Sequence, residues 1–156
     1  MSKSLKRVTR ALREAGIAAE VLEMDGSTRT AAEAAAQAGC AIDQICKSVI
    51  FCGEDSGVAR LFLTAGGNRV CAETASTLAG ERLGKADAAL IRAQTGFAIG
   101  GVAPVGHLSP IRAWFDPRLM DFEVVYAAAG TPRHIVPIPP GEILRLTGAE
   151  KADFTG

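Results

Sequence analysis

Residues 45–52, "ICKSVIFC", constrain the fold of this chain more than any other stretch. The stretch is β-branched and apolar on both alternating faces, and a strand of that kind is buried on both sides. A turn, "GEDSG", follows, and "VARLFLTA" at 58–65 is its natural hairpin partner. These residues therefore predict the centre of a sheet that other elements cover on each face.

The elements expected around this hairpin are helices and strands that do not alternate regularly. Apolar residues at helical spacing predict an N-terminal helix over 2–15, which Gly16 ends. Thr30 and Glu33 form a capping-box pattern at the start of a helix that Gly39 ends. The other expected elements are a strand at 18–24, helices at 73–79 and 86–94, strands at 111–115, 122–128 and 134–138, and a last helix around 141–148. This order predicts one α/β domain over residues 1–156 with a mixed sheet.

Composition excludes several classes of function. Seventeen basic and seventeen acidic side chains cancel, so any nucleic-acid contact must come from a local patch. The four cysteines form no C-x-x-C pair, which favours reduced thiols and argues against structural zinc. No apolar run is long enough to span a bilayer, and no signal-peptide core follows the basic N-terminus. We therefore expect a cytoplasmic protein without membrane contact.

Lys47 is the first residue that could carry chemistry. On a regular strand its side chain points the same way as Val49 and Phe51, and Ser48 points the opposite way, which disfavours a serine activated by this lysine. The commoner interpretation is a strand-end lysine that lifts its ammonium into water. The alternative is a cation at the mouth of a pocket, where reduced solvation strengthens its attraction for a developing negative charge.

The second candidate is the loop at 95–107, "TGFAIGGVAPVGH", with four glycines and a proline. Glycine allows a close approach of the main chain to a ligand, so the N–H groups of Gly100, Gly101, Val102 and Ala103 could converge on one oxygen. An equally acceptable interpretation is a tight connection that packed helices crowd. For the two histidines, His107 and His134, a hydrogen-bonding role is favoured over general-base catalysis.

The ordered set of motifs resembles the YbaK/ProX-type aminoacyl-tRNA deacylases, the freestanding relatives of the prolyl-tRNA synthetase editing domain. The resemblance covers nearly the whole chain and rests on "STRTAAEAA", "CKSVIF", "LTAGGNRV", "GFAIGGVAPVGH" and "PPGEIL". It implies a mixed, mostly antiparallel sheet that forms a distorted barrel with helices packed outside. The implied activity is hydrolysis of the ester between a wrong amino acid and tRNA, with no metal or organic cofactor.

The resemblance also implies roles for particular residues. The essential lysine of the family corresponds to Lys47, and its G-x-x-x-P loop corresponds to Gly100 through Pro104. We expect the amides of Gly100, Gly101, Val102 and Ala103 to bind the carbonyl oxygen, and Lys47 to add charge and hold the substrate backbone or terminal phosphate. The vicinal ribose hydroxyl of the tRNA would help to move the proton. The other expected substrate-binding positions are Ala103, Pro104, Gly106, Ala128 and His134, with a further wall from Met24–Thr30.

The expected substrate is tRNA(Pro) that carries a small amino acid such as alanine or cysteine. Cysteine-clearing relatives have a hydroxyl-bearing stretch where this chain has "AAAG" at 127–130, and Ala128 supplies no hydroxyl there. Basic residues of the first helix could contact the tRNA or form an ordinary solvated face; they include Lys3, Lys6, Arg7 and Arg10. Prolyl-tRNA synthetase is a candidate partner. Two alternatives remain open: a non-catalytic aminoacyl-binding module and a hydrolase of another small acyl ester.

Overall fold

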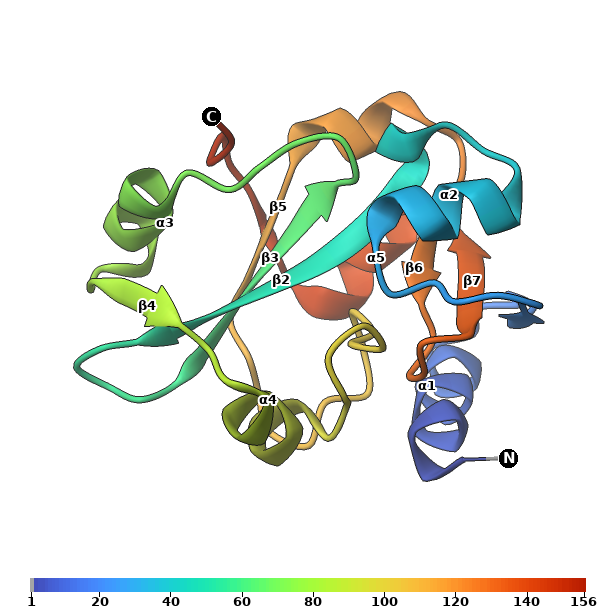
Figure 1. Cartoon of the computed structure of the whole chain (residues 1–156), viewed down its shortest axis with the longest axis horizontal. Helices are drawn as coiled ribbons and strands as arrows, with labels where there is room; N and C mark the ends of the chain where they lie inside the picture. The colour runs from blue at the N-terminus through green and yellow to red at the C-terminus, as the bar shows by residue number, and fades with distance from the viewer. Residues whose placement is uncertain (1) are drawn as a thin grey trace.

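The computed structural model describes residues 2–156 as one mixed sheet with helices around it (Figure 1). Within these residues the helices are α1 (Lys3–Glu14), α2 (Ala31–Ala38), α3 (Ala72–Ala79), α4 (Ala88–Thr95) and α5 (Pro140–Thr147), with short 3-10 turns at Ile42–Gln44 and Pro117–Asp121. The strands are β1 (Leu22–Glu23), β2 (Ile45–Gly53), β3 (Ala59–Ala65), β4 (Leu83–Lys85), β5 (Ala113–Phe115), β6 (Val125–Ala128), β7 (His134–Ile138) and β8 (Glu150–Lys151). The predicted mixed α/β architecture is confirmed.

The sheet is built outward from the β2–β3 hairpin. Its order is β1-β7-β6-β2-β3-β5-β8, and β4 pairs with the C-terminal end of β2. The pairs β2–β3, β2–β4, β6–β7 and β1–β7 are antiparallel, whereas β2–β6, β3–β5 and β5–β8 are parallel. Within residues 2–156 the outer strands β1 and β8 do not pair with each other, so hydrogen bonds do not close the sheet. Its central hairpin strand is the one that the sequence predicted.

Local signals account for most element boundaries. The side chain of Ser2 caps α1, and the Thr30 hydroxyl accepts a hydrogen bond from the Glu33 amide at 3.1 Å, as the capping-box pattern predicted. Gly39 ends α2 in the left-handed conformation. The strand expected at 18–24 is reduced to Leu22–Glu23, and β4 and β8 were not predicted. These edge strands are too short to show a clear alternation of apolar residues.

Two separate apolar clusters cover the two faces of β2. One cluster holds the buried residues of α1 together with Ile91, Val102 and Ile143, and Cys46 of β2 belongs to it. The other is aromatic and centres on the stacked rings of Phe62 and Trp114, 4.8 Å apart, against which Val49 and Phe51 pack. The prediction that β2 is covered on both faces is therefore confirmed.

Candidate active site

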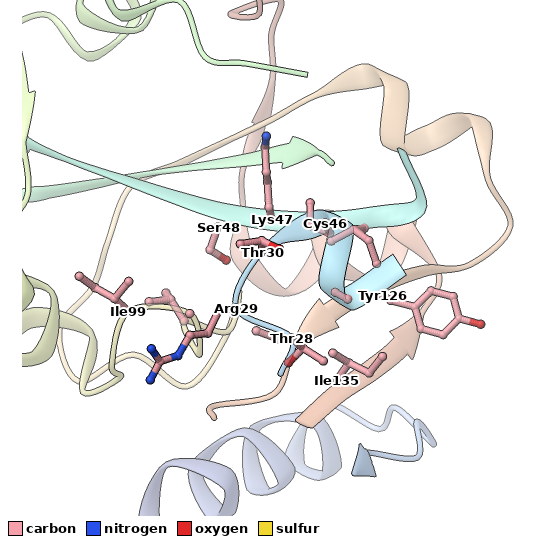
Figure 2. A pocket seen from close by; sticks show the side chains of 15 residues that line it. Thr28, Arg29, Thr30, Cys46, Lys47, Ser48, Ile99, Tyr126 and Ile135 are labelled. Atoms are coloured by element: carbon pink, nitrogen blue, oxygen red, sulfur yellow. The ribbon is translucent and has the colours of Figure 1, made fainter. Parts of the chain in front are cut away.

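A cavity of about 190 Å³ opens where β2 begins, between the loop that precedes α2 and the loop that follows α4 (Figure 2). Residues of β6 and β7 complete the wall. The lining residues are Thr28, Arg29, Thr30, Ala31, Ala34, Ile45, Cys46, Lys47, Ser48, Ile99, Gly100, Val102, Tyr126, Ala128 and Ile135. Of the wall expected at Met24–Thr30, the last three residues line this cavity. The cavity joins segments that are far apart in the sequence.

Lys47 and Ser48 leave β2 on opposite sides of the sheet. Figure 2 shows Ser48 directed toward the side of Ile99 and Arg29, whereas the ammonium of Lys47 extends the other way. The packing agrees, since Cys46, on the Ser48 side, belongs to the cluster that contains Val102. The expectation that the Lys47 ammonium lies beside the glycine loop is therefore corrected. Strand alternation fixes which residues share a face, but only the fold decides which face the loop covers.

The Lys47 ammonium rests on the main chain beyond β3. Its Nζ donates a hydrogen bond to the carbonyl oxygen of Gly66 at 3.2 Å. Partial burial and the neighbouring cation of Arg69 lower its pKa, and the carboxylates of Asp116 and Asp43 oppose that shift. The side chain thus forms one wall of the cavity while its charge is held outside it.

The hydroxyl of Ser48 has an unusual environment. Its Oγ is buried, and it makes no hydrogen bond within residues 2–156. Burial of an unpaired hydroxyl typically costs about 1–3 kcal/mol. The Cys46 thiol, also in the wall, stays protonated because burial, and to a smaller extent the charge of Asp116, raises its pKa to about 12.

The loop at 95–107, called the glycine loop below, presents two of its residues to the cavity. Gly100 and Val102 line it, and their amides, like that of Ala103, make no hydrogen bond within residues 2–156. Gly100 has φ of +87°, a backbone conformation that residues with a side chain rarely adopt. These two amides remain candidates for binding a carbonyl oxygen.

The amide of Gly101 is not available for a ligand. It donates a hydrogen bond to the carbonyl of Ala98 at 3.0 Å. A Cβ at Gly101 would lie 2.9 Å from the main chain of Thr131, so this glycine allows two loops to pack closely. The expectation that four consecutive amides converge on one oxygen is therefore wrong for Gly101, because a turn already uses its N–H group.

The second half of the glycine loop lies outside the cavity lining. Pro104 and Gly106 face a different hollow, beside the C-terminal end of α1. Ala103 is fully buried, and its carbonyl accepts a hydrogen bond from Nε2 of His107 at 2.7 Å. The structure therefore does not bring these expected substrate-binding positions to the cavity. His107 has the hydrogen-bonding role that the sequence favoured.

Of the two expected substrate-binding residues on β6 and β7, only one reaches the cavity. Ala128 lines the cavity, as expected. His134 is outside the lining, where its Nδ1 pairs with the hydroxyl of Thr131 and its Nε2 lies 3.9 Å from Glu23. The apolar wall includes Ile45, Tyr126 and Ile135, which the sequence did not single out. Alternation along a strand indicates which of its side chains share a face. No sequence signal, however, showed that β2, β6 and β7 meet here.

The basic residues of α1 are not equivalent. Lys3, Lys6 and Arg10 are exposed. Arg7 instead donates hydrogen bonds to the carbonyls of Gly106 at 3.1 Å and Gly96 at 2.8 Å. Its guanidinium also lies 4.7 Å from the centroid of the Phe97 ring. Arg7 therefore anchors the helix to the glycine loop, which corrects its assignment to a free tRNA-binding surface.

Residues 2–156 lack the features of two other classes of site. No three His, Cys, Asp or Glu side chains gather in an arrangement that could hold a metal ion. None of the described helices combines the length and apolar character needed to cross a membrane.

Comparisons with known proteins define the class of this chain. Residues 25–146 match the aminoacyl-tRNA editing domain, a stretch that contains every residue of the cavity wall. The chain therefore belongs to the aminoacyl-tRNA editing-domain family, as its motifs indicated.

Individual relatives agree with this class. A solved protein that has been provisionally identified as a trans-editing enzyme for prolyl-tRNA synthetase is 45% identical, with a TM-score of 0.92 over 100% of this chain and 99% of that one. A scaffold from computational epitope grafting is 41% identical, with a TM-score of 0.91 over the same shares of the two chains. YwhH of Bacillus subtilis (strain 168), an uncharacterized protein, is 28% identical over 124 residues, 80% of this chain and 78% of its own.

Proposed function

We propose that this protein hydrolyses the ester bond of a mischarged aminoacyl-tRNA and so releases a small, wrong amino acid. The observation that carries the proposal is the cavity of about 190 Å³ with the unpaired amides of Gly100 and Val102 at its wall. Hydrogen-bond donors fixed in a small site can stabilise the negative oxygen of a tetrahedral intermediate. Membership of the editing-domain family supplies the class of substrate.

The size of the cavity supports a small acyl group. Pockets for drug-sized ligands span about 300–1,000 Å³, so this one suits an amino-acid moiety while the tRNA remains outside. Apolar residues such as Ile45 and Val102 share the wall with hydroxyl-bearing residues such as Ser48, but Ala128 offers no hydroxyl to a polar side chain. We therefore favour alanine over cysteine as the amino acid. The similarity to a protein associated with prolyl-tRNA synthetase favours tRNA(Pro) as the carrier and this synthetase as the partner.

The proposed reaction needs positioning more than a strong base. Water attacks the ester carbonyl carbon, and the amides of Gly100 and Val102 hold the oxygen that becomes negative. The C–O bond to the ribose then breaks, the ribose oxygen takes a proton, and the products are free amino acid and tRNA. The vicinal ribose hydroxyl relays the proton. This scheme requires the ammonium of Lys47 to leave the Gly66 carbonyl and turn toward the ester. The movement is needed because the attraction between a cation and an oxyanion falls with distance.

The test is release of amino acid from alanyl-tRNA(Pro), cysteinyl-tRNA(Pro) and simple alanyl esters. We expect alanyl-tRNA(Pro) to be cleaved fastest. Rapid cleavage of the esters with indifference to the tRNA would instead favour a general acyl-ester hydrolase. Binding of the aminoacyl group without any cleavage would favour a non-catalytic module.

A second experiment separates the two interpretations of Lys47. We expect Lys47→Ala to reduce deacylation roughly hundredfold with little change in Tm, as expected when a transition-state contact is lost. Lys85→Ala, which removes an exposed lysine of β4, is the matched control. A fall in Tm with unchanged deacylation per folded molecule would show instead that Lys47 only anchors the chain at Gly66.

The exposed cations of α1 complete the proposal. Lys3, Lys6 and Arg10 would contact tRNA phosphates, in a cytoplasmic setting where charged tRNA is used. Since few phosphates are engaged, tRNA affinity should fall with rising salt along a shallow slope. A binding constant that does not change with salt would remove this helix from the tRNA interface.

A further inference from the structure

The cavity leaves the rest of the substrate outside. At about 190 Å³ it takes an aminoacyl group, so the ribose and phosphate of the terminal nucleotide must lie beyond its mouth. Lys47 is not available to hold that phosphate, because the proposed reaction turns its ammonium from the Gly66 carbonyl toward the ester. A different cation beside the mouth is therefore the candidate for this role.

Arg29 stands at the boundary between the cavity and a second, open hollow. Figure 2 shows its guanidinium directed away from Tyr126 and out of the cavity. Its aliphatic stem lies over the glycine loop, since a Cβ on Gly100 would be 2.7 Å from Cγ of Arg29. The hollow has a volume of about 520 Å³ and is lined by Ser27, Arg29, Glu33, Pro132 and Arg133. Arg29 is the residue that the two spaces share.

Both arginines of the hollow are free to bind an anion. Within residues 2–156 neither Arg29 nor Arg133 forms an ion pair, whereas arginines elsewhere, such as Arg60 and Arg118, do. The loops that carry them are tied together, because the amide and hydroxyl of Thr28 both donate to the carbonyl of Pro132, at 2.7 and 2.8 Å. These bonds hold the main-chain segments that carry the two arginines next to each other.

Among the remaining polar groups of the hollow, the Ser27 hydroxyl suits a phosphate, whereas the charge of Glu33 opposes one and is outnumbered by the two arginines. Ser27 Oγ accepts a hydrogen bond from the Arg29 amide at 3.2 Å, which leaves its O–H to donate. The one carboxylate in the lining, Glu33, accepts a hydrogen bond from the Thr30 hydroxyl at 3.0 Å within the capping box of α2. Arginine binds phosphate oxygens in two parallel hydrogen bonds and is weakly hydrated, so two unpaired arginines favour a phosphate over a neutral group.

We propose that Arg29 and Arg133 form the site for the phosphate of the terminal nucleotide of the substrate tRNA. This inference rests on the proposed function. The aminoacyl group enters the cavity, the stem of Arg29 lies between the two spaces, and the phosphate sits in the neighbouring hollow. The site thereby distinguishes an aminoacylated nucleotide from a simple amino-acid ester.

The test uses an alanyl-adenosine analogue with a 3′-amide in place of the ester, made with and without a 5′-phosphate. Its affinity is measured by calorimetry for the unsubstituted protein and for Arg29→Gln, Arg133→Gln and Arg82→Gln. Arg82 is the matched control, since it is exposed and precedes β4, at the opposite end of the sheet from β7 in Figure 1.

We expect the phosphate to tighten binding to the unsubstituted protein roughly tenfold, as a charge-assisted contact should. This ratio should fall to about twofold in Arg29→Gln and in Arg133→Gln, and stay near tenfold in Arg82→Gln. An unchanged ratio in the first two variants, or an equal fall in the control, would overturn the site.

The same probe keeps the two proposals separate, because an amide is not cleaved. The expected ratios without hydrolysis of alanyl-tRNA(Pro) would end the proposed function and leave the phosphate site standing. Hydrolysis of alanyl-tRNA(Pro) with no preference for the phosphate would end the site and leave the function.

Discussion

Residues 99–102 and 103–107, called the first and second half of the glycine loop below, both contain glycine but have different neighbours. Residues 99–102 reach the cavity, where the amides of Gly100 and Val102 are unpaired. Residues 103–107 pack toward α1, where Arg7 binds the carbonyl of Gly106 and His107 binds that of Ala103. Glycine has no side chain, so it allows the main chain to approach a neighbouring group closely. Whether that neighbour is a ligand or a helix depends on the fold, and the predictions below test this division.

The largest effect should come from Gly100→Ala. We expect the deacylation kcat to fall roughly hundredfold, since the φ of +87° and the contact with Arg29 would turn the amide away from the carbonyl oxygen. The matched control is Gly57→Ala, which has φ of +70° but open space around its Cβ position. The control should lose similar stability by calorimetry and keep its kcat. Equal kcat values for the two variants would contradict a catalytic role for the first half of the loop.

Gly101→Ala should act mainly on stability. The added Cβ would lie 2.9 Å from the main chain of Thr131, and overpacking against main chain costs about 1–3 kcal/mol. For a chain of this size we expect Tm to fall by about 2–4 °C for each kcal/mol lost. Activity per folded molecule should fall less than in Gly100→Ala. The reverse order of activities would show that the Gly101 main chain contacts the substrate.

Arg7→Met should loosen the glycine loop near both of its ends, at Gly96 and Gly106. It removes hydrogen bonds to the carbonyls of Gly106 and Gly96, and we expect the free energy of unfolding to fall by about 1.5 kcal/mol. Lys6→Met, on the exposed face of α1, is the control and should change unfolding by less than about 0.5 kcal/mol. Denaturant unfolding measures both. If the two variants unfold alike, Arg7 does not anchor the loop.

The smallest effect concerns the pH dependence of stability. Burial lowers the pKa of His107 below its ordinary value of 6.5, and the cation of Arg7 adds to this, while the bond to the Ala103 carbonyl opposes it. The unfolded chain therefore binds a proton more readily than the folded one. Stability from this group is complete above about pH 6.5 and is lost as the pH falls toward the folded pKa.

We expect Tm to decrease between pH 7.5 and 5.5, and to decrease less in His107→Gln, which keeps a donor for the Ala103 carbonyl. Both series can be measured by calorimetry. An identical pH dependence in the two proteins would show that folding does not lower the pKa of His107.

The sequence predicted the elements whose signals are local. The capping box at Thr30 and Glu33, the glycine at position 39 and the apolar alternation of 45–52 each act within a few residues, and each is confirmed. The short strands β4 and β8 were missed because two or three residues carry no recognisable period. The alternation also placed Lys47 and Ser48 on opposite faces, as Figure 2 shows.

The sequence by itself determined that a strand covered on both faces carries Lys47, and that a glycine-rich loop approaches something closely. Only the tertiary structure decided that the loop covers the Ser48 face, that Gly101 uses its amide in a turn, and that Arg29 meets Gly100. The physical reason is the distance along the chain over which each kind of signal acts. Periodicity and capping act between near neighbours in the chain, whereas the cavity is formed by segments that meet only when the sheet assembles.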